Sequence, residues 1–139
     1  MKKTLFTLSI ISFLVVANED KSMFLSLFED NDVKSAEEVF IFSYLADESK
    51  FLIKWEIEEN YYLYLSSILI KQGSNIIDFE IDDANIIDHE DEFFGETKII
   101  RDSLKISLGN EINIAGTKVF YQGCADKGFC YPVQSKDLN

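Results

Sequence analysis

Residues 51–57 read FLIKWEI, and this stretch places an apolar side chain at every second position. The apolar series consists of Phe51, Ile53, Trp55 and Ile57. Lys54 and Glu56 fall between them, so the opposite side of the segment is charged. A period of two residues is typical of an extended strand, whose successive side chains point to opposite faces of a sheet. The stretch therefore predicts a β-strand with one face in a core and the other in water.

Similar stretches follow one another from residue 40 onward. Strands are expected over residues 40–44, 51–57, 61–70, 76–81, 98–101, 104–108, 111–114 and 117–122. Turn sequences separate the first of them: ADES at 46–49, EEN at 58–60 and KQGSN at 71–75. Many short strands at a spacing of about 8 to 12 residues, with almost no helical period, are typical of a sandwich of two sheets. We therefore expect an all-β fold of the immunoglobulin-like class.

An acidic stretch interrupts this pattern at residues 82–96, DDANIIDHEDEFFGE. It holds seven carboxylates and is expected to be a long connection with little regular structure. Phe93 and Phe94 stand side by side among these charges, which is an unusual place for two large rings. Either one ring packs into the core at the edge of the sandwich, or one lies over the cysteines with Asp91 and Glu92 beside it. The second arrangement would disfavour a thiolate, but the residues alone leave both interpretations open.

Both cysteines of the chain lie in YQGCADKGFC at residues 121–130, where Cys124 and Cys130 enclose five residues. Gly123 and Gly128 suit a tight loop, because glycine adopts backbone conformations that other residues resist. A hairpin-like excursion would bring the two sulfurs together at its base. Closing so short a loop stabilises a fold by only about 2 to 2.5 kcal/mol in the chain-entropy model. The pair is therefore interpreted in two ways, as an inert bridge or as a bond that exchanges with other thiols.

The first residues have the pattern of an export signal. Lys2 and Lys3 precede an apolar run over residues 5–16, and Ala17 offers a small residue for cleavage. The run is shorter than the roughly 20 residues of a membrane-spanning helix, which favours a cleaved signal peptide over an anchor. Export to an oxidising compartment also favours a disulfide between the cysteines. We therefore expect a signal peptide over 1–17, an amino-terminal arm over 18–38 and one exported domain over 39–139.

The chain carries a formal net charge of −12 at pH 7. Nucleic acids and anionic membrane surfaces are therefore poor partners, because both attract positive charge. His89 is the only histidine, and with the two cysteines it fits no common zinc spacing, so no metal and no cofactor are expected. A hydrolase built on a cysteine and a histidine is also disfavoured, since no further residue completes the constellation.

Three separated stretches carry a resemblance to a known family. They are YYLYL at 61–65, HEDEFFGETKIIRDSL at 89–104 and YQGCADKGFCYP at 121–132. In order and approximate spacing they resemble the amino-terminal periplasmic domain of the DsbD family of thiol:disulfide interchange proteins. The resemblance covers about residues 40–136. It implies an immunoglobulin-like sandwich with a cysteine-bearing loop and a cap loop.

The resemblance also implies roles for residues of this chain. Cys124 and Cys130 would be the redox pair, with Cys130 the site of the mixed disulfide. A cap loop would shield the pair until a partner displaces it, with Phe93 as the shielding ring and the two carboxylates as acidic neighbours of the sulfurs. The residues of that loop are Asp91, Glu92, Phe93, Phe94 and Gly95. Tyr62 and Tyr64 would line the site, a role that the residues alone do not distinguish from packing in the sheet.

Electron transfer without a cofactor is the function that the resemblance implies. Such a domain receives electrons from a thioredoxin-like donor domain. It passes them to oxidised periplasmic thioredoxin-fold proteins, which serve disulfide isomerisation and cytochrome c maturation. The expected location is the periplasm, with contact to the membrane only through a missing or separate transmembrane partner.

Other interpretations remain beside this one. The chain would be either a fragment of a longer membrane protein or a free-standing carrier. One alternative function is a secreted β-sandwich binding module with an inert structural disulfide. Another is an oxidoreductase that acts directly on misfolded proteins.

Replacing Phe93 by alanine tests the expected cap. The change would remove the ring that shields the reduced pair, so small alkylating agents should react with its thiols severalfold faster. The rate is measured by counting alkylated cysteines by mass against time. An unchanged rate would show that this ring does not cover the sulfurs.

Overall fold

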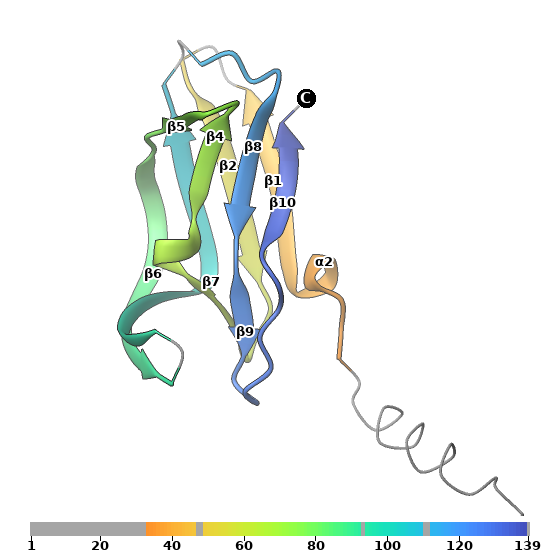
Figure 1. Cartoon of the computed structure of the whole chain (residues 1–139), viewed down its shortest axis with the longest axis vertical. Coiled ribbons are helices and arrows are strands. Elements are labelled where there is room, and N and C mark those ends of the chain that lie inside the picture. The colour runs from red at the N-terminus through yellow and green to blue at the C-terminus, as the bar shows by residue number, and fades with distance from the viewer. Residues whose placement is uncertain (1–32, 47–48, 93, 110–111, 139) are drawn as a thin grey trace, which may run out of the picture. The chain divides into compact units, whose positions relative to one another are not determined.

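A computed structural model describes residues 33–46, 49–92, 94–109 and 112–138 of the chain (Figure 1). The expected signal peptide over 1–17 and most of the arm over 18–38 lie outside the described residues. The residues from Lys34 onward cluster as one folded unit. None of the helices in the described part of the chain is long and apolar enough to cross a membrane.

The larger sheet is built around one long strand, β7, which pairs with three others. Its strands are β1 (Phe40–Ala46), β2 (Phe51–Ile57), β3 (Tyr61–Tyr64), β6 (Glu80–Asp91), β7 (Gly95–Leu108) and β9 (Gly123–Ala125). β2 pairs with residues 103–108 of β7 and β3 pairs with residues 99–100, so the two short strands share one partner. β1 extends the sheet from β2, and β9 extends it from β3. All of these pairings are antiparallel.

The smaller sheet has four strands in the order β10-β8-β4-β5. They are β4 (Leu69–Gln72), β5 (Asn75–Ile77), β8 (Thr117–Tyr121) and β10 (Gln134–Leu138). The short helix α2 (Ala36–Val39) precedes β1, and the 3-10 turn η1 (Leu65–Ser67) carries the chain from the larger sheet to the smaller one. Figure 1 shows the two sheets stacked face to face. This arrangement confirms the predicted all-β class.

Apolar side chains from both sheets fill the space between them. The alternation predicted for residues 51–57 is confirmed, because the apolar series is at most 6% exposed whereas Lys54 and Glu56 face water. Tyr121 of β8 stacks on Phe42 with ring centroids 6.3 Å apart, and it meets Trp55 edge-on at 5.6 Å. These ring contacts join the smaller sheet to the larger one.

The expectation of a loose connection over residues 82–96 is wrong. Residues 80–91 form β6, which pairs along nearly its whole length with β7. Most of β6 is exposed to water, where carboxylates remain solvated. Lys98 of β7 also pairs with Asp88 at 2.5 Å. Backbone pairing therefore outweighs the low strand propensity of aspartate.

The strand expected over residues 61–70 is divided between the two sheets. β3 ends at Tyr64, and η1 turns the chain before β4 begins at Leu69. The Ser67 hydroxyl fixes this turn, because it donates to the Tyr64 carbonyl at 2.7 Å and accepts from the Gln122 amide at 2.9 Å. A serine in the turn thus interrupts an apolar run that otherwise has the pattern of one strand.

Other strand boundaries also differ from expectation. The strands expected over 98–101 and 104–108 are a single strand, β7, with a register shift beside Asp102. The strand expected over 76–81 is split between β5 and β6, and residues 112–114 of the one expected over 111–114 form no strand. The strand expected over 117–122 is confirmed as β8. Periodicity therefore predicts the positions of most strands more accurately than it predicts where they begin and end.

Gly123 lies at a point where β9 and β3 approach each other closely. A Cβ atom at this position would lie 2.3 Å from the Tyr62 carbonyl oxygen and 2.5 Å from the Phe40 ring. Both distances are shorter than a van der Waals contact, and the carbonyl belongs to paired backbone that cannot move alone. Glycine therefore allows β9 to pair with β3 directly before Cys124.

Gly123→Ala should lower the free energy of unfolding by about 3 kcal/mol, because the new methyl group must displace paired backbone. Gly109→Ala is the matched control, since a Cβ atom there meets no atom within 4 Å. Denaturant unfolding at pH 7 measures both variants. A loss below about 1 kcal/mol for Gly123→Ala would contradict the close approach of the two strands.

Candidate functional site

The two cysteines lie opposite each other at the base of a short loop and are joined by a disulfide. Cys124 is the middle residue of β9, and Cys130 forms an isolated antiparallel bridge with it. The loop closes on itself, because the Ala125 amide donates to the Phe129 carbonyl at 2.7 Å and the Gly128 amide to the Ala125 carbonyl at 2.9 Å. The hairpin-like excursion predicted from the sequence is confirmed.

The two cysteines differ in exposure. Cys124 is fully buried, at 0% exposure, whereas Cys130 is only partly buried. The loop residues from Asp126 to Phe129 are exposed. A thiolate that approaches from solvent therefore reaches Cys130 before Cys124.

Tyr62 and Tyr64 of β3 pack against Cys124. Successive residues of a strand point to opposite faces, so Leu63 enters the main core while both tyrosines face the other way. Tyr62 stands directly opposite Cys124 in the pairing of β3 with β9. The two rings meet edge-on at 5.4 Å, and Ile99 of β7 completes a small buried cluster around Cys124. The structure thus brings both predicted site-lining tyrosines to the cysteine pair.

A hydroxyl group connects the buried cysteine to an acidic side chain. The Tyr64 hydroxyl oxygen lies 3.4 Å from the Cys124 sulfur and donates a hydrogen bond of 2.6 Å to Asp91 Oδ2. Burial, followed by this hydrogen bond, raises the pKa of Tyr64 above its ordinary value. The hydroxyl therefore keeps its proton over the physiological range. Asp91 is separated from the sulfur by this one hydroxyl group.

The expected cap loop over residues 91–95 connects β6 to β7. Asp91 ends β6, and its Oδ1 accepts a hydrogen bond of 2.7 Å from the Phe94 amide. The Phe94 ring packs on Tyr64 with centroids 4.5 Å apart, although the residue is 51% exposed. The loop therefore reaches the tyrosine that contacts the buried sulfur.

Three further residues belong to the expected cap loop. Glu92 is exposed in the turn, and Gly95 begins β7 with a φ of 65°, in the left-handed region that glycine adopts without strain. Phe93, the expected shielding ring, lies outside the described residues. Its role stays a prediction.

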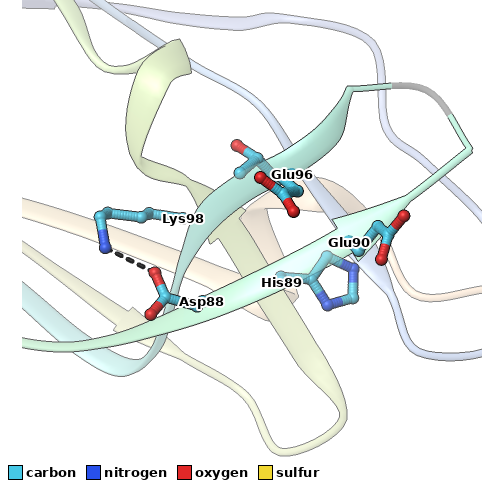
Figure 2. Close-up of a pocket in the computed structure, with 6 residues that line it drawn as sticks. Asp88, His89, Glu90, Glu96 and Lys98 are labelled. Carbon is cyan, nitrogen blue, oxygen red and sulfur yellow. Dashed lines mark hydrogen bonds and ion pairs between the residues drawn. The ribbon is translucent and has the colours of Figure 1, made fainter.

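A hollow on the hairpin of β6 and β7 lies next to this loop. It is lined by Asp88, His89, Glu90, Glu96, Thr97 and Lys98. Figure 2 shows side chains from both strands around it, with the ion pair of Asp88 and Lys98 crossing between them. His89 Nε2 lies 3.8 Å from Asp91 Oδ2, and the His89 ring centroid is 5.2 Å from that of Tyr62. Within the described ranges, no three His, Cys, Asp or Glu side chains are grouped to hold a metal ion.

Two charged residues at the cysteine loop were not predicted from the sequence. Arg101 of β7 donates two hydrogen bonds to Asp126, at 2.8 and 3.2 Å, and its guanidinium carbon lies 5.4 Å from the Tyr62 ring centroid. A signal was present, because Arg101 is the only arginine in the sequence and Asp126 lies between the cysteines. A single charged residue is nevertheless typical of a solvated strand face, so the pattern gives no reason to select it.

Most of the chain matches a known protein family. Residues 30–139 match the family described as thiol:disulfide interchange protein DsbD, N-terminal. The chain belongs to this family. DsbD of Colwellia psychrerythraea is 37% identical over 127 residues, which cover 86% of this chain and 21% of that protein. DsbD of Escherichia coli K12 is 36% identical over 106 residues, or 74% of this chain and 18% of that protein. The chain therefore spans about a fifth of the length of these DsbD relatives.

Two known structures share the fold of this DsbD amino-terminal domain. The DsbD amino-terminal domain of Neisseria meningitidis in its reduced form has a TM-score of 0.63 and 24% identity, over 76% of this chain and 86% of that one. The complex between the DsbD and PilB amino-terminal domains of the same organism gives a TM-score of 0.56 and 21% identity, over 78% and 87%. These likenesses confirm the predicted immunoglobulin-like sandwich.

Removing the Tyr64 hydroxyl should destabilise the fold, because the hydrogen bond to Asp91 is lost. Tyr64→Phe keeps the ring and deletes the hydrogen bond to the carboxylate, so the free energy of unfolding should fall by about 1.5 kcal/mol. Combining Tyr64→Phe with Asp91→Asn should cost less than the sum of the single losses, because both changes affect one hydrogen bond. Denaturant unfolding at pH 7 measures the cycle. Additivity within about 0.3 kcal/mol would show that the two groups are not coupled.

Proposed function

We propose that the bond between Cys124 and Cys130 is reactive and that this domain passes electrons through it by thiol–disulfide exchange. The placement of the pair carries the proposal, because Cys130 is reachable from solvent whereas Cys124 is buried against Tyr62 and Tyr64. The bond closes a loop with a sequence separation of 6, so it constrains little of the chain. Membership of the DsbD amino-terminal family supports the same role.

The exchange begins at the more exposed sulfur. A donor thiolate attacks Cys130 Sγ, the bond between the cysteines breaks, and Cys124 leaves as a thiolate that takes up a proton. A second donor thiolate then attacks the donor's own sulfur in the mixed disulfide and releases Cys130 as a thiolate, which also takes up a proton. Two electrons and two protons have then entered the pair, and the donor has become a disulfide. The same steps in reverse order reduce an oxidised acceptor.

The surroundings of Cys124 suit a pair that stays reduced until it meets a partner. The Asp91 carboxylate lies beyond the Tyr64 hydroxyl, and its negative charge disfavours a second negative charge on the sulfur. A protonated thiol is a poor nucleophile, so stray oxidants react with it slowly. Electrons held in the pair are therefore preserved in an oxidising compartment.

The cap loop over residues 91–95 is proposed to limit access to the pair. Phe94 already packs on Tyr64, and Phe93 is proposed as the ring that shields the sulfurs. Glu92 would add a second negative charge beside them. Cys130 is only partly buried, and a docking partner would displace the loop and widen the access to it.

Both partners in the exchange are proposed to be thioredoxin-like proteins. A thioredoxin-like donor domain would supply electrons, and oxidised thioredoxin-fold proteins for disulfide isomerisation or cytochrome c maturation would accept them. One structural neighbour is described as a complex between DsbD and PilB amino-terminal domains, so a domain of this fold can dock another protein domain. No cofactor is required, because the sulfurs themselves carry the electrons.

The proposed location is the periplasm. A signal peptide over residues 1–17 would be cleaved after export, leaving an arm over 18–38 and the exchange domain over 39–139. The net charge of −12 at pH 7 speaks against nucleic acid as a partner. Contact with the membrane would arise only through a missing or separate transmembrane partner.

The reduction potential of the pair tests this function. It is measured by equilibrating the purified chain in defined thiol buffers and counting alkylated cysteines by mass. We expect a midpoint of about −180 to −270 mV, the range of thioredoxin-like exchange proteins. A midpoint in this range lets the pair both accept electrons from such proteins and donate to them.

A midpoint below about −300 mV would contradict the proposal, because structural disulfides of exported proteins resist reduction to that extent. The domain would then be a β-sandwich binding module with an inert bridge. A variant with both cysteines replaced by serine is the control, and it should show no alkylation at any buffer ratio.

A further inference from the structure

We propose that Arg101 is a positioning residue that holds the cysteine loop in the geometry of the closed disulfide. It binds Asp126 inside the loop and the face of Tyr62 behind the loop, so the two cysteines stay close together after the bond between them breaks. The inference rests on the proposed exchange at Cys124 and Cys130. It extends that proposal from the sulfurs to a residue of β7.

Arg101 makes three kinds of contact at the site. Its Nη2 donates to Asp126 Oδ1 at 2.8 Å and its Nη1 donates to Asp126 Oδ2 at 3.2 Å. This is the bidentate geometry that is common between arginine and a carboxylate. Nη1 also lies 3.5 Å from the Tyr61 carbonyl oxygen. The guanidinium carbon is 5.4 Å from the Tyr62 ring centroid, within the range of a cation–π contact. One side chain thus joins the loop, the backbone of β3 and the ring opposite Cys124.

The ion pair with Asp126 is partly shielded from water. The side chain of Arg101 is 28% exposed and that of Asp126 is 40% exposed. The backbone of the same loop residue is held as well, because the Asp126 amide donates to the Asn60 carbonyl at 2.9 Å. Asp126 is therefore fixed by both its backbone and its side chain.

A bulge in β7 gives Arg101 its direction. In the pairing of β7 with β6, Arg101 lies opposite Asn85 and Leu104 lies opposite Ala84. Residues 102–103 of β7 therefore have no partner in β6. Asp102 has a φ of 64°, in the left-handed region, and its Oδ2 accepts a hydrogen bond of 2.7 Å from the Asn85 side-chain amide. Bulges bend a strand and re-aim its side chains, and they are frequent beside functional sites. The backbone of β7 is therefore bent directly after Arg101, next to the cysteine loop that Arg101 contacts.

The ion pair of Arg101 with Asp126, called the clamp below, matters most when the disulfide is open. In the oxidised form the covalent bond itself keeps the loop closed. In the reduced form the contacts of Arg101 and a few backbone hydrogen bonds hold the two thiols together. A held loop raises the effective concentration of one thiol at the other, which favours the disulfide. Releasing the loop should therefore make the bond easier to reduce.

Arg101→Gln and Asp126→Asn, each made in the full chain, test the clamp. Each variant is equilibrated with reduced and oxidised glutathione, and the fraction of alkylated cysteines gives the equilibrium constant. We expect each change to shift this constant about fivefold toward the dithiol, as for the loss of one well-formed ion pair. For a two-electron couple this shift makes the potential about 20 mV less negative. The double variant should shift little further, because both changes remove the same contact.

Two more variants separate the clamp from simpler effects. Lys118→Gln removes an ion pair with Asp137, at 3.1 Å between β8 and β10, and it should leave the constant unchanged. Arg101→Lys keeps the positive charge but loses the bidentate geometry. Its equilibrium constant should therefore lie between those of the unaltered chain and of Arg101→Gln. Denaturant unfolding of the oxidised forms shows which variants are folded. If Arg101→Gln is not folded, the more exposed Asp126→Asn decides the outcome.

Folded variants of Arg101 and Asp126 with the constant of the unaltered chain would overturn the proposal. A shift in the opposite direction would also overturn it, because losing a cation that only stabilised a thiolate would disfavour the reduced form. Failure of the proposed function is seen separately. It appears as a very negative midpoint of the unaltered chain, whereas the clamp is judged from the difference between variant and unaltered chain.

Discussion

The side chains of β3 alternate between two buried clusters, one in the core between the sheets and one around Cys124. Leu63 enters the core between the sheets, while Tyr62 and Tyr64 on either side of it face Cys124. A strand of four residues therefore packs the fold with one face and holds the cysteine pair with the other. Gly123 makes this possible, because a side chain at that position would collide with the backbone of β3.

Two charged side chains, Asp91 and Arg101, reach the surroundings of the cysteine pair through different contacts. Asp91 reaches Cys124 through the Tyr64 hydroxyl and, in the proposed function, disfavours a thiolate on this sulfur. Arg101 reaches the loop through Asp126 and, in the proposal made above, bears on the distance between the two sulfurs. The nucleophilicity of the pair and its equilibrium with other thiols can therefore be set by separate residues. Such a separation would suit the proposed exchange, in which the pair must hold electrons and also release them.

Local pattern was sufficient for the parts of the fold that depend on near neighbours. The period of two in FLIKWEI predicted a half-buried strand, and the cysteine spacing predicted the loop. The acidic segment 82–96 is predicted to be a connection, but residues 82–91 belong to a strand because β6 pairs with β7. Arg101 meets Asp126 from 25 residues away, across a bulge that no periodicity reveals. The expected roles of the two tyrosines and of the cap loop come from the family resemblance, not from the pattern of residues.

β6 is an edge strand of the larger sheet, since within the described part of the chain it pairs only with β7. An unpaired border offers backbone hydrogen bonds to any other extended chain, which is a common route to aggregation. The carboxylates along β6 repel a second copy of the same strand, because like charges would come to face each other. The same charges that conceal the strand pattern in the sequence therefore disfavour pairing of this edge with a second copy of the chain.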